Sequence, residues 1–113
     1  MTRYRLFALA VVFITGSRGV AQPVYFADEN LKAAVKEALG IATDPTQANM
    51  LQLQGLDVWP SRGIGDLTGI EYATNLKYLG LSGNHISDIS PLASLTALED
   101  LWLFENQISS IEP

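Results

Sequence analysis

Apolar residues recur along the second half of the chain with a fixed period, and this period predicts the architecture. Residues 75–113 repeat themselves at an offset of twenty-two positions. The matching pairs are Leu76 and Leu98, Leu79 and Leu101, Leu81 and Leu103, Asn84 and Asn106, Ile86 and Ile108, Ile89 and Ile111, and Pro91 and Pro113. A period of this length is typical of units that each contain one short strand and a return segment, stacked side by side into a solenoid.

Within a unit the apolar positions alternate as they do in a strand. Leu79 and Leu81 lie on one side of a short strand, and Tyr78, Gly80 and Ser82 lie on the other. We expect the leucine side to face the core and the other side to face solvent. The return path carries further apolar residues, with a proline where a regular helix would otherwise compete: Ile86, Ile89, Pro91, Leu92 and Leu95.

An earlier, imperfect unit aligns with these two if its turn holds one extra residue. Its strand positions match at an offset of twenty-three and its return positions at twenty-two: Leu53, Leu56 and Val58, then Ile64, Leu67, Ile70 and Ala73. The insertion therefore lies within residues 59–63, which contain no Asn.

Asn84 and Asn106 follow the strands of the two regular units, where the chain turns off the sheet. An Asn amide can donate to and accept from backbone groups at such a turn. We therefore predict a structural asparagine ladder that starts at Asn84. Because no further unit follows, we expect Asn106 to lack a following backbone to bond.

Residues 64–113 resemble the twenty-two-residue repeats of internalin-type bacterial leucine-rich-repeat proteins, on the runs IGDLTGIEYATNL and LSGNHISDISPL. Residues 24–50 are similar to the helical N-terminal cap of that family. The resemblance implies an α/β solenoid: a leucine-rich-repeat right-handed superhelix with short parallel strands and an α-helical N-terminal cap. It also implies a protein partner bound through the concave strand face.

The first twenty-one residues have the pattern of a secretory signal peptide. Arg3 and Arg5 precede an apolar core over residues 6–14, and small residues end at Ala21. The core is too short to span a bilayer, although a retained membrane anchor is the alternative. We expect export, to a secreted or cell-surface location, and no membrane insertion after cleavage.

Residues 22–52 are predicted to form the helical cap, and residues 53–113 about two and a half repeats. Asp28 is placed to cap a helix that ends at Gly40; its apolar face is Leu31, Val35, Ala38 and Leu39. Asp44 followed by Pro45 predicts a second helix start. A membrane-surface role for the first helix is disfavoured because only Lys32 and Lys36 are basic there.

The last repeat has no following apolar residues to cover it. We expect a bare edge made of Leu101, Leu103, Ile108 and Ile111, with an unpaired strand around Trp102. Two explanations stand open: the chain is the front part of a longer solenoid, or a second chain covers the edge, including by self-association.

Charge and chemistry exclude several classes of function. Without the first twenty-one residues the chain has four Lys plus Arg and twelve acids, 4 − 12 = −8, which disfavours nucleic acid as a partner. Ser82, His85 and Asp88 are close in sequence but share one turn, so they do not predict a catalytic triad. We expect no enzyme activity, no cofactor and no metal site, with His85 exposed. Asp66 and Asp88 are expected to bond local backbone N–H groups rather than calcium.

The outward strand residues are the candidate protein-binding residues of the concave face: Asp57, Trp59, Tyr78, Asp100, Trp102 and Phe104. Adjacent units should align them in columns, Asp57 with Gly80 and Trp102, and Trp59 with Ser82 and Phe104. In the alternative, Trp102 lies across the gap at Gly80 and Phe104 covers Ser82, which is packing without a partner. We predict a non-catalytic protein-recognition module; the alternative is a structural cap and first repeats without binding activity.

Overall fold

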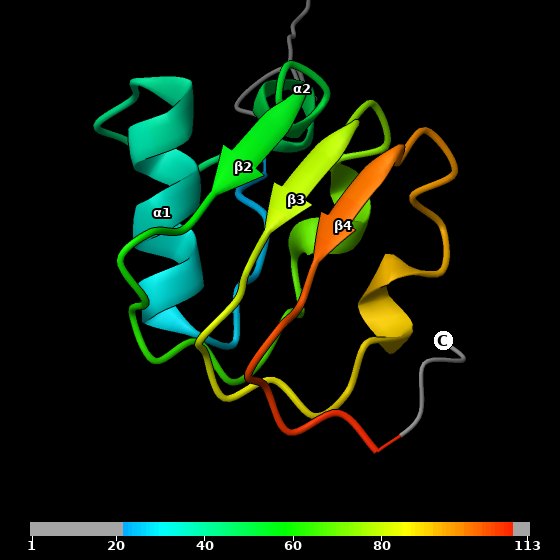
Figure 1. Cartoon of the computed structure of the whole chain (residues 1–113). Helices are drawn as coiled ribbons and strands as arrows, with labels where there is room; N and C mark the ends of the chain where they lie inside the picture. The colour runs from blue at the N-terminus through cyan, green and yellow to red at the C-terminus, as the bar shows by residue number, and fades with distance from the viewer. Residues whose placement is uncertain (1–21, 110–113) are drawn as a thin grey trace, which may run out of the picture.

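The computed structural model describes residues 22–109, which form a three-stranded parallel sheet with helical segments behind it and beside it (Figure 1). The elements are α1 (Glu29–Leu39), α2 (Gln47–Met50), β2 (Gly55–Asp57), β3 (Tyr78–Gly80) and β4 (Asp100–Trp102), with 3₁₀ turns η1 (Ile70–Tyr72) and η2 (Ser90–Leu92). The predicted signal peptide and Ile111 lie outside the described residues. Within residues 22–109, no helix is long and apolar enough to cross a membrane.

The strand register confirms the predicted repeat offsets. In the order β2-β3-β4, Leu56 pairs with Leu79 and Leu79 with Leu101, at offsets of twenty-three and twenty-two residues. After each strand the chain turns and runs back behind the sheet, where η1 lies next to η2 (Figure 1). The fold is therefore the predicted α/β solenoid of parallel strands.

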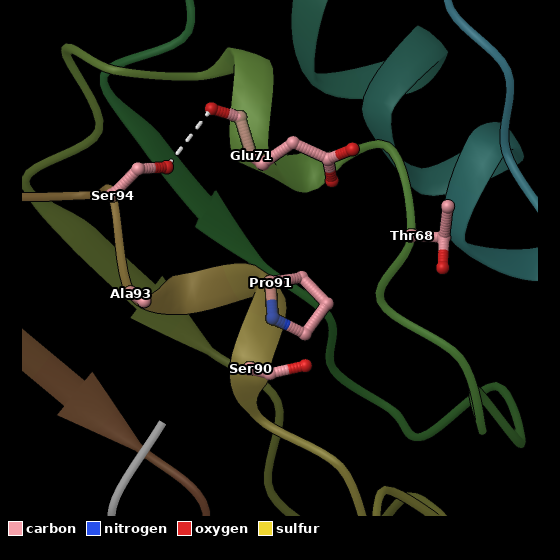
Figure 2. Close-up of a pocket in the computed structure, with 6 residues that line it drawn as sticks. All are labelled: Thr68, Glu71, Ser90, Pro91, Ala93 and Ser94. Carbon is pink, nitrogen blue, oxygen red and sulfur yellow. Dashed lines mark hydrogen bonds between the residues drawn. The ribbon is translucent and has the colours of Figure 1, made fainter.

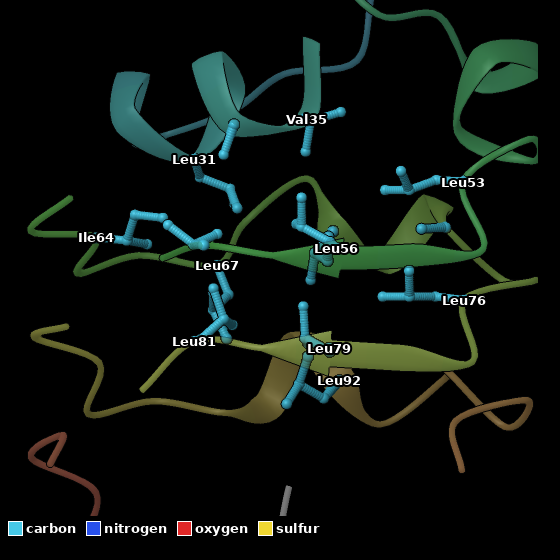
Figure 3. Close-up of a cluster of buried hydrophobic side chains, with 14 of the residues drawn as sticks. Leu31, Val35, Leu53, Leu56, Ile64, Leu67, Leu76, Leu79, Leu81 and Leu92 are labelled. Atoms are coloured by element: carbon cyan, nitrogen blue, oxygen red, sulfur yellow. The ribbon is translucent and has the colours of Figure 1, made fainter. Parts of the chain in front are cut away.

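The core is a stack of apolar layers from the cap and the first two units (Figure 3). All the predicted inward residues of the first two units are buried, from Leu53 through to Leu95. Leu31 and Val35 of α1 form a further layer beside β2, and both are fully buried. The cap thus covers the apolar side of the first repeat, as a terminal unit of a solenoid must.

The first helix has the predicted ends but a different buried face. Asp28 caps it by accepting a hydrogen bond from the Asn30 N–H at 2.9 Å, and Gly40 ends it in the left-handed conformation with φ of 68°. The prediction for Ala38 is wrong, because Ala38 is exposed and Ala34 is buried instead. Ala34 lies one turn before Ala38, on the side of α1 that packs on the first repeat.

The predicted start of the second helix is also wrong. Its N-cap is Thr46, which forms a reciprocal capping box with Asn49. Pro45 is buried outside the helix, and its carbonyl accepts a hydrogen bond from the Val24 N–H at 2.7 Å. Asp44 instead forms an ion pair of 2.9 Å with Lys32. Asp44 and Thr46 are both suitable N-cap residues. Because Asp44 is paired with Lys32, Thr46 caps the helix.

Two long-range contacts hold the cap to the first repeat. The second carboxylate oxygen of Asp28 accepts hydrogen bonds from the Gly65 N–H at 2.7 Å and the Asp66 N–H at 3.3 Å. Arg62 donates from both terminal nitrogens to the carboxylate of Glu37 in α1, at 3.0 and 2.6 Å. The turn that follows β2 is therefore tied to both ends of α1.

The asparagines bond backward, toward the preceding unit. Asn84 Oδ1 accepts from the N–H groups of Arg62 and Ile64 at 3.2 and 2.9 Å, and its amide nitrogen donates to the Leu81 carbonyl at 2.9 Å. Asn106 Oδ1 accepts from the Ile86 N–H at 3.0 Å, and its amide also donates to the Leu81 carbonyl. All the backbone partners of Asn106 in the described residues precede it in the chain, in its own unit and the unit before it.

The last described unit is more open than the others. Leu101 is 44% exposed, whereas its counterpart Leu79 is fully buried. Leu103 and Ile108 are half-buried, and β4 pairs with β3 alone in the described sheet. The side of the solenoid beyond β4 therefore presents apolar surface, as predicted for these residues.

Candidate binding face

The outward residues of the three strands form one surface, which we call the strand face. It comprises Gly55, Asp57 and Trp59 of the first unit, Tyr78, Gly80 and Ser82 of the second, and Asp100, Trp102 and Phe104 of the third. The register confirms the predicted column of Asp57, Gly80 and Trp102. In the neighbouring column the Phe104 N–H donates to Ser82 Oγ at 3.0 Å.

Aromatic side chains dominate the exposed part of this face. Trp59 is 76% exposed, Phe104 64% and Trp102 46%, while Tyr78 is half-buried. The rings of Trp102 and Phe104 meet edge to face, with their centroids 5.7 Å apart. Exposed tryptophan and tyrosine are frequent anchors in protein interfaces because they bury a large area with little loss of conformational freedom.

A shallow hollow lies at the centre of the strand face, over Gly80. It is lined by side chains from all three units. Asp57, Val58 and Trp59 come from the first unit, Tyr78, Gly80 and Ser82 from the second, and Trp102 from the third. Because neighbouring strands place their outward side chains side by side, three short strands are enough to build a site from three distant segments.

Gly80 sets the floor of this hollow. A methyl group built on Gly80 would lie 2.8 Å from the Asp57 carboxylate and 2.9 Å from the Tyr78 hydroxyl. These two polar groups therefore converge over the glycine. Trp102 lines the same hollow, and Asp57 and Tyr78 are the groups nearest to the position of a Gly80 side chain.

The strand face carries negative charge without a basic residue at any of its nine positions. Asp57 and Asp100 are its ionisable carboxylates, and both are exposed. Among residues 22–109, Lys32 and Arg62 form ion pairs with Asp44 and Glu37, and the Arg62–Glu37 pair lies beside Asp57 at the edge of the strand face. Hydrogen bonds with these basic partners lower the pKa of Asp44 and Glu37.

The opposite side of the sheet has a depression between η1 and η2 (Figure 2). The polar groups in it are already engaged locally. Ser94 Oγ donates to the Glu71 carbonyl at 3.5 Å, and the Glu71 carboxylate accepts from the Gly69 N–H at 2.7 Å. The depression therefore lies between two neighbouring turns whose polar groups bond each other.

Ser82, His85 and Asp88 have separate partners. Ser82 accepts from Phe104, His85 Nδ1 lies 3.5 Å from Gln107 Nε2, and Asp88 accepts from the Ser90 N–H at 2.9 Å. His85 is exposed, as predicted. Across the described residues, no group of three or more His, Cys, Asp or Glu side chains could hold a metal ion.

Asp66 and Asp88 bond local backbone, which confirms their predicted role. Asp66 Oδ1 accepts from the Thr68 hydroxyl at 2.7 Å and the Thr68 N–H at 2.9 Å. Hydrogen bonds to the Thr68 side chain and then its backbone lower the pKa of Asp66, and a backbone bond from Ser90 lowers the pKa of Asp88. Both carboxylates thus hold the turns that enter the return path.

Sequence reasoning placed the outward residues but missed how Asp57 and Tyr78 converge. The pattern treats Asp57 and Tyr78 as members of different columns, because Gly55, Tyr78 and Asp100 form a third column. The sequence feature that could have predicted this arrangement is Gly80. It occupies an outward position next to Asp57 in the same column, and it leaves room above it for the side chains of its neighbours.

Comparison with known proteins identifies the same repeats. A family described as Leucine Rich repeats (2 copies) matches residues 74–113. An internalin, inlF from Listeria monocytogenes, is 37% identical with a TM-score of 0.71, over 76% of this chain and 26% of that chain. Internalin C2 from the same organism is 32% identical with a TM-score of 0.74, over 84% of this chain and 45% of that chain.

A structure of the CBM51-2 and INT domains of Clostridium perfringens ZmpB is also similar. It is 30% identical with a TM-score of 0.67, over 75% of this chain and 18% of that chain. A sequence search of curated proteins found no match. The chain spans less than half the length of each of these solved structures. The similarity to internalin C2 covers 84% of this chain, which is more than the repeats alone.

Proposed function

Because this chain is an internalin-type leucine-rich-repeat protein, we propose that it is a non-catalytic module that recognises another protein through its strand face. The single observation that carries this proposal is the exposure of three aromatic rings on the strand face, Trp59, Trp102 and Phe104. Large aromatic side chains held in solvent on a rigid sheet favour burial against a partner.

Hydrogen bonds between the units also make the strand face a preorganised platform. Backbone hydrogen bonds between units fix its outward residues, including Val58 N–H to Gly80 carbonyl and Leu81 N–H to Trp102 carbonyl, both at 2.8 Å. A preorganised surface loses little conformational entropy on binding. We propose that the protein acts outside the cell of an exporting bacterium, secreted or at the surface.

Panning a displayed peptide library against the purified protein tests this proposal. Enriched peptides should bind Trp102→Ala and Phe104→Ala at least about tenfold more weakly than the parent protein, as expected for interface anchors. Tyr72→Ala is the matched control, because Tyr72 is a partly exposed aromatic in η1 on the other side of the sheet. Peptides that respond to Tyr72→Ala and not to the strand-face changes would contradict the proposal.

The competing function is a purely structural one, in which this segment supports binding located elsewhere on a longer protein. The exposed Leu101 favours it, since that side chain offers a surface on which a further unit would stack. Under this proposal panning should enrich no peptide that depends on Trp102 or Phe104. The two functions therefore predict opposite outcomes for the same variants.

A further inference from the structure

We propose that the hollow over Gly80 receives an arginine side chain of the protein partner. This inference rests on the proposed function and adds the chemistry of the contact. The hollow combines one carboxylate, Asp57, with a phenol and two indoles, those of Tyr78, Trp59 and Trp102. A guanidinium can stack on aromatic faces and donate paired hydrogen bonds to a carboxylate, so it suits both kinds of wall.

The floor of the hollow supports this assignment. The Asp57 carboxylate and the Tyr78 hydroxyl each come within 3 Å of the position that a Gly80 side chain would take, at 2.8 and 2.9 Å. Both groups can accept a hydrogen bond from a guanidinium. A glycine at this position leaves the acceptors open to an incoming group, whereas any side chain would displace them.

The charge of the strand face selects a cation over an anion. Asp57 and Asp100 are its carboxylates, and its nine positions include no Lys or Arg. Arg62, at the edge of this face near Asp57, is engaged by Glu37. An acidic partner segment would meet the two carboxylates. A guanidinium beside Asp57 would gain attraction that is partly shielded from water by the surrounding rings.

Tryptophan fluorescence gives a direct readout, because both tryptophans of the chain, Trp59 and Trp102, line this hollow. The probe is N-acetyl-argininamide added to the purified protein. Its control is N-acetyl-citrullinamide, which has the same shape without the charge. We expect a saturable fluorescence change at millimolar concentration, with a dissociation constant at least about fivefold lower for the arginine compound.

Two variants should abolish this preference while leaving the fold intact. Asp57→Asn removes the charge, and Gly80→Ala pushes Asp57 and Tyr78 apart, since a methyl group there would lie less than 3 Å from each of them. Glu29→Gln is the matched control, because it removes an exposed carboxylate on α1. Circular dichroism of each variant should match that of the parent protein.

Equal responses to the arginine and citrulline compounds would overturn the inference, as would an arginine preference that survives Asp57→Asn. A saturable response to the neutral sugar N-acetylglucosamine, unchanged in Asp57→Asn, would also overturn it and point to a carbohydrate. The proposed function fails separately. If panned peptides depend on Trp102 while arginine shows no preference, only this inference is lost.

Discussion

The Asn84 side chain bonds backbone groups of two units at one turn of the solenoid. It is 3% exposed, and its amide accepts from two N–H groups of the preceding unit and donates to two carbonyls of its own unit. Asn106 has the same position in the next unit but is half-buried and accepts from one N–H group. The two asparagines therefore form a natural comparison of a completed turn and a partly open one.

We predict that Asn84→Ala lowers the free energy of unfolding by about 2–4 kcal/mol, because it leaves the buried N–H group of Ile64 and the partly buried N–H group of Arg62 without their acceptor. Asn106→Ala should lower it by about 1–2 kcal/mol, because Asn106 accepts only one backbone hydrogen bond and is more exposed to solvent than Asn84. Urea denaturation followed by circular dichroism measures both. Equal costs for the two variants would show that the bonds to the preceding unit do not determine the effect.

At the scale of elements, the contact between α1 and the first repeat depends on Asp28. One carboxylate oxygen caps the helix and the other accepts from Gly65 and Asp66. We predict that Asp28→Ala lowers the free energy of unfolding by about 1–2 kcal/mol, since it removes a helix cap and exchanges two further exposed hydrogen bonds for bonds to water.

Asp28→Asn separates these two roles of the side chain. Asn still caps a helix well, but its NH₂ group would face the Gly65 N–H in place of an oxygen. We expect a loss between zero and that of Asp28→Ala. Glu29→Gln, one residue away, should change stability by less than about 1 kcal/mol. A loss as large for Glu29→Gln would attribute the effect to helix charge instead.

The elements that sequence reasoning placed correctly are those with local or periodic signals. The ends of α1 followed from Asp28 and Gly40, and the strand register followed from the spacing of Leu56, Leu79 and Leu101. The start of α2 failed because Asp44 and Thr46 are both good caps, and a distant residue, Lys32, engages the first. The choice between these two capping residues therefore depends on a tertiary contact, which the local sequence does not show.

The binding face shows the same division. Alternation along the strands assigned the outward residues, and the repeat offset assigned the column of Asp57, Gly80 and Trp102. How Tyr78 and Asp57 lean over Gly80 depends on side-chain conformations across two strands, which no spacing rule describes. Likewise the bond from Gly65 to Asp28 joins residues thirty-seven positions apart, one in the cap and one in a turn.

At the scale of the whole molecule, local hydrogen bonds and ion pairs of carboxylates make the stability of the fold depend on pH. The pKa values of Glu37, Asp44, Asp66 and Asp88 are lowered from ordinary values of 4.5 for Glu and 3.8 for Asp. A carboxylate with a lowered pKa in the folded state stabilises that state above its unfolded pKa. This contribution is lost as pH falls through the folded pKa.

We therefore predict that Tm is nearly constant from about pH 5 to pH 9 and falls as pH drops below about 4. Lys32 adds the opposite limit: its hydrogen bond with Asp44 raises its pKa above 10.5, so its contribution disappears in strong alkali. Thermal unfolding followed by circular dichroism across this range is the measurement. A Tm that rises as pH falls through 4 would mean that relief of repulsion among the excess acids outweighs these bonds.

The backward direction of the asparagine bonds also fixes an order in time. The turn after β2 donates N–H groups to Asn84 Oδ1, and the next turn donates to Asn106 Oδ1, so each acceptor is supplied by the unit that follows. A ribosome makes the chain from its N-terminus, so each turn emerges before the residue that closes it. Every unit must wait for about twenty residues of further synthesis, roughly one to four seconds, before its turn is complete.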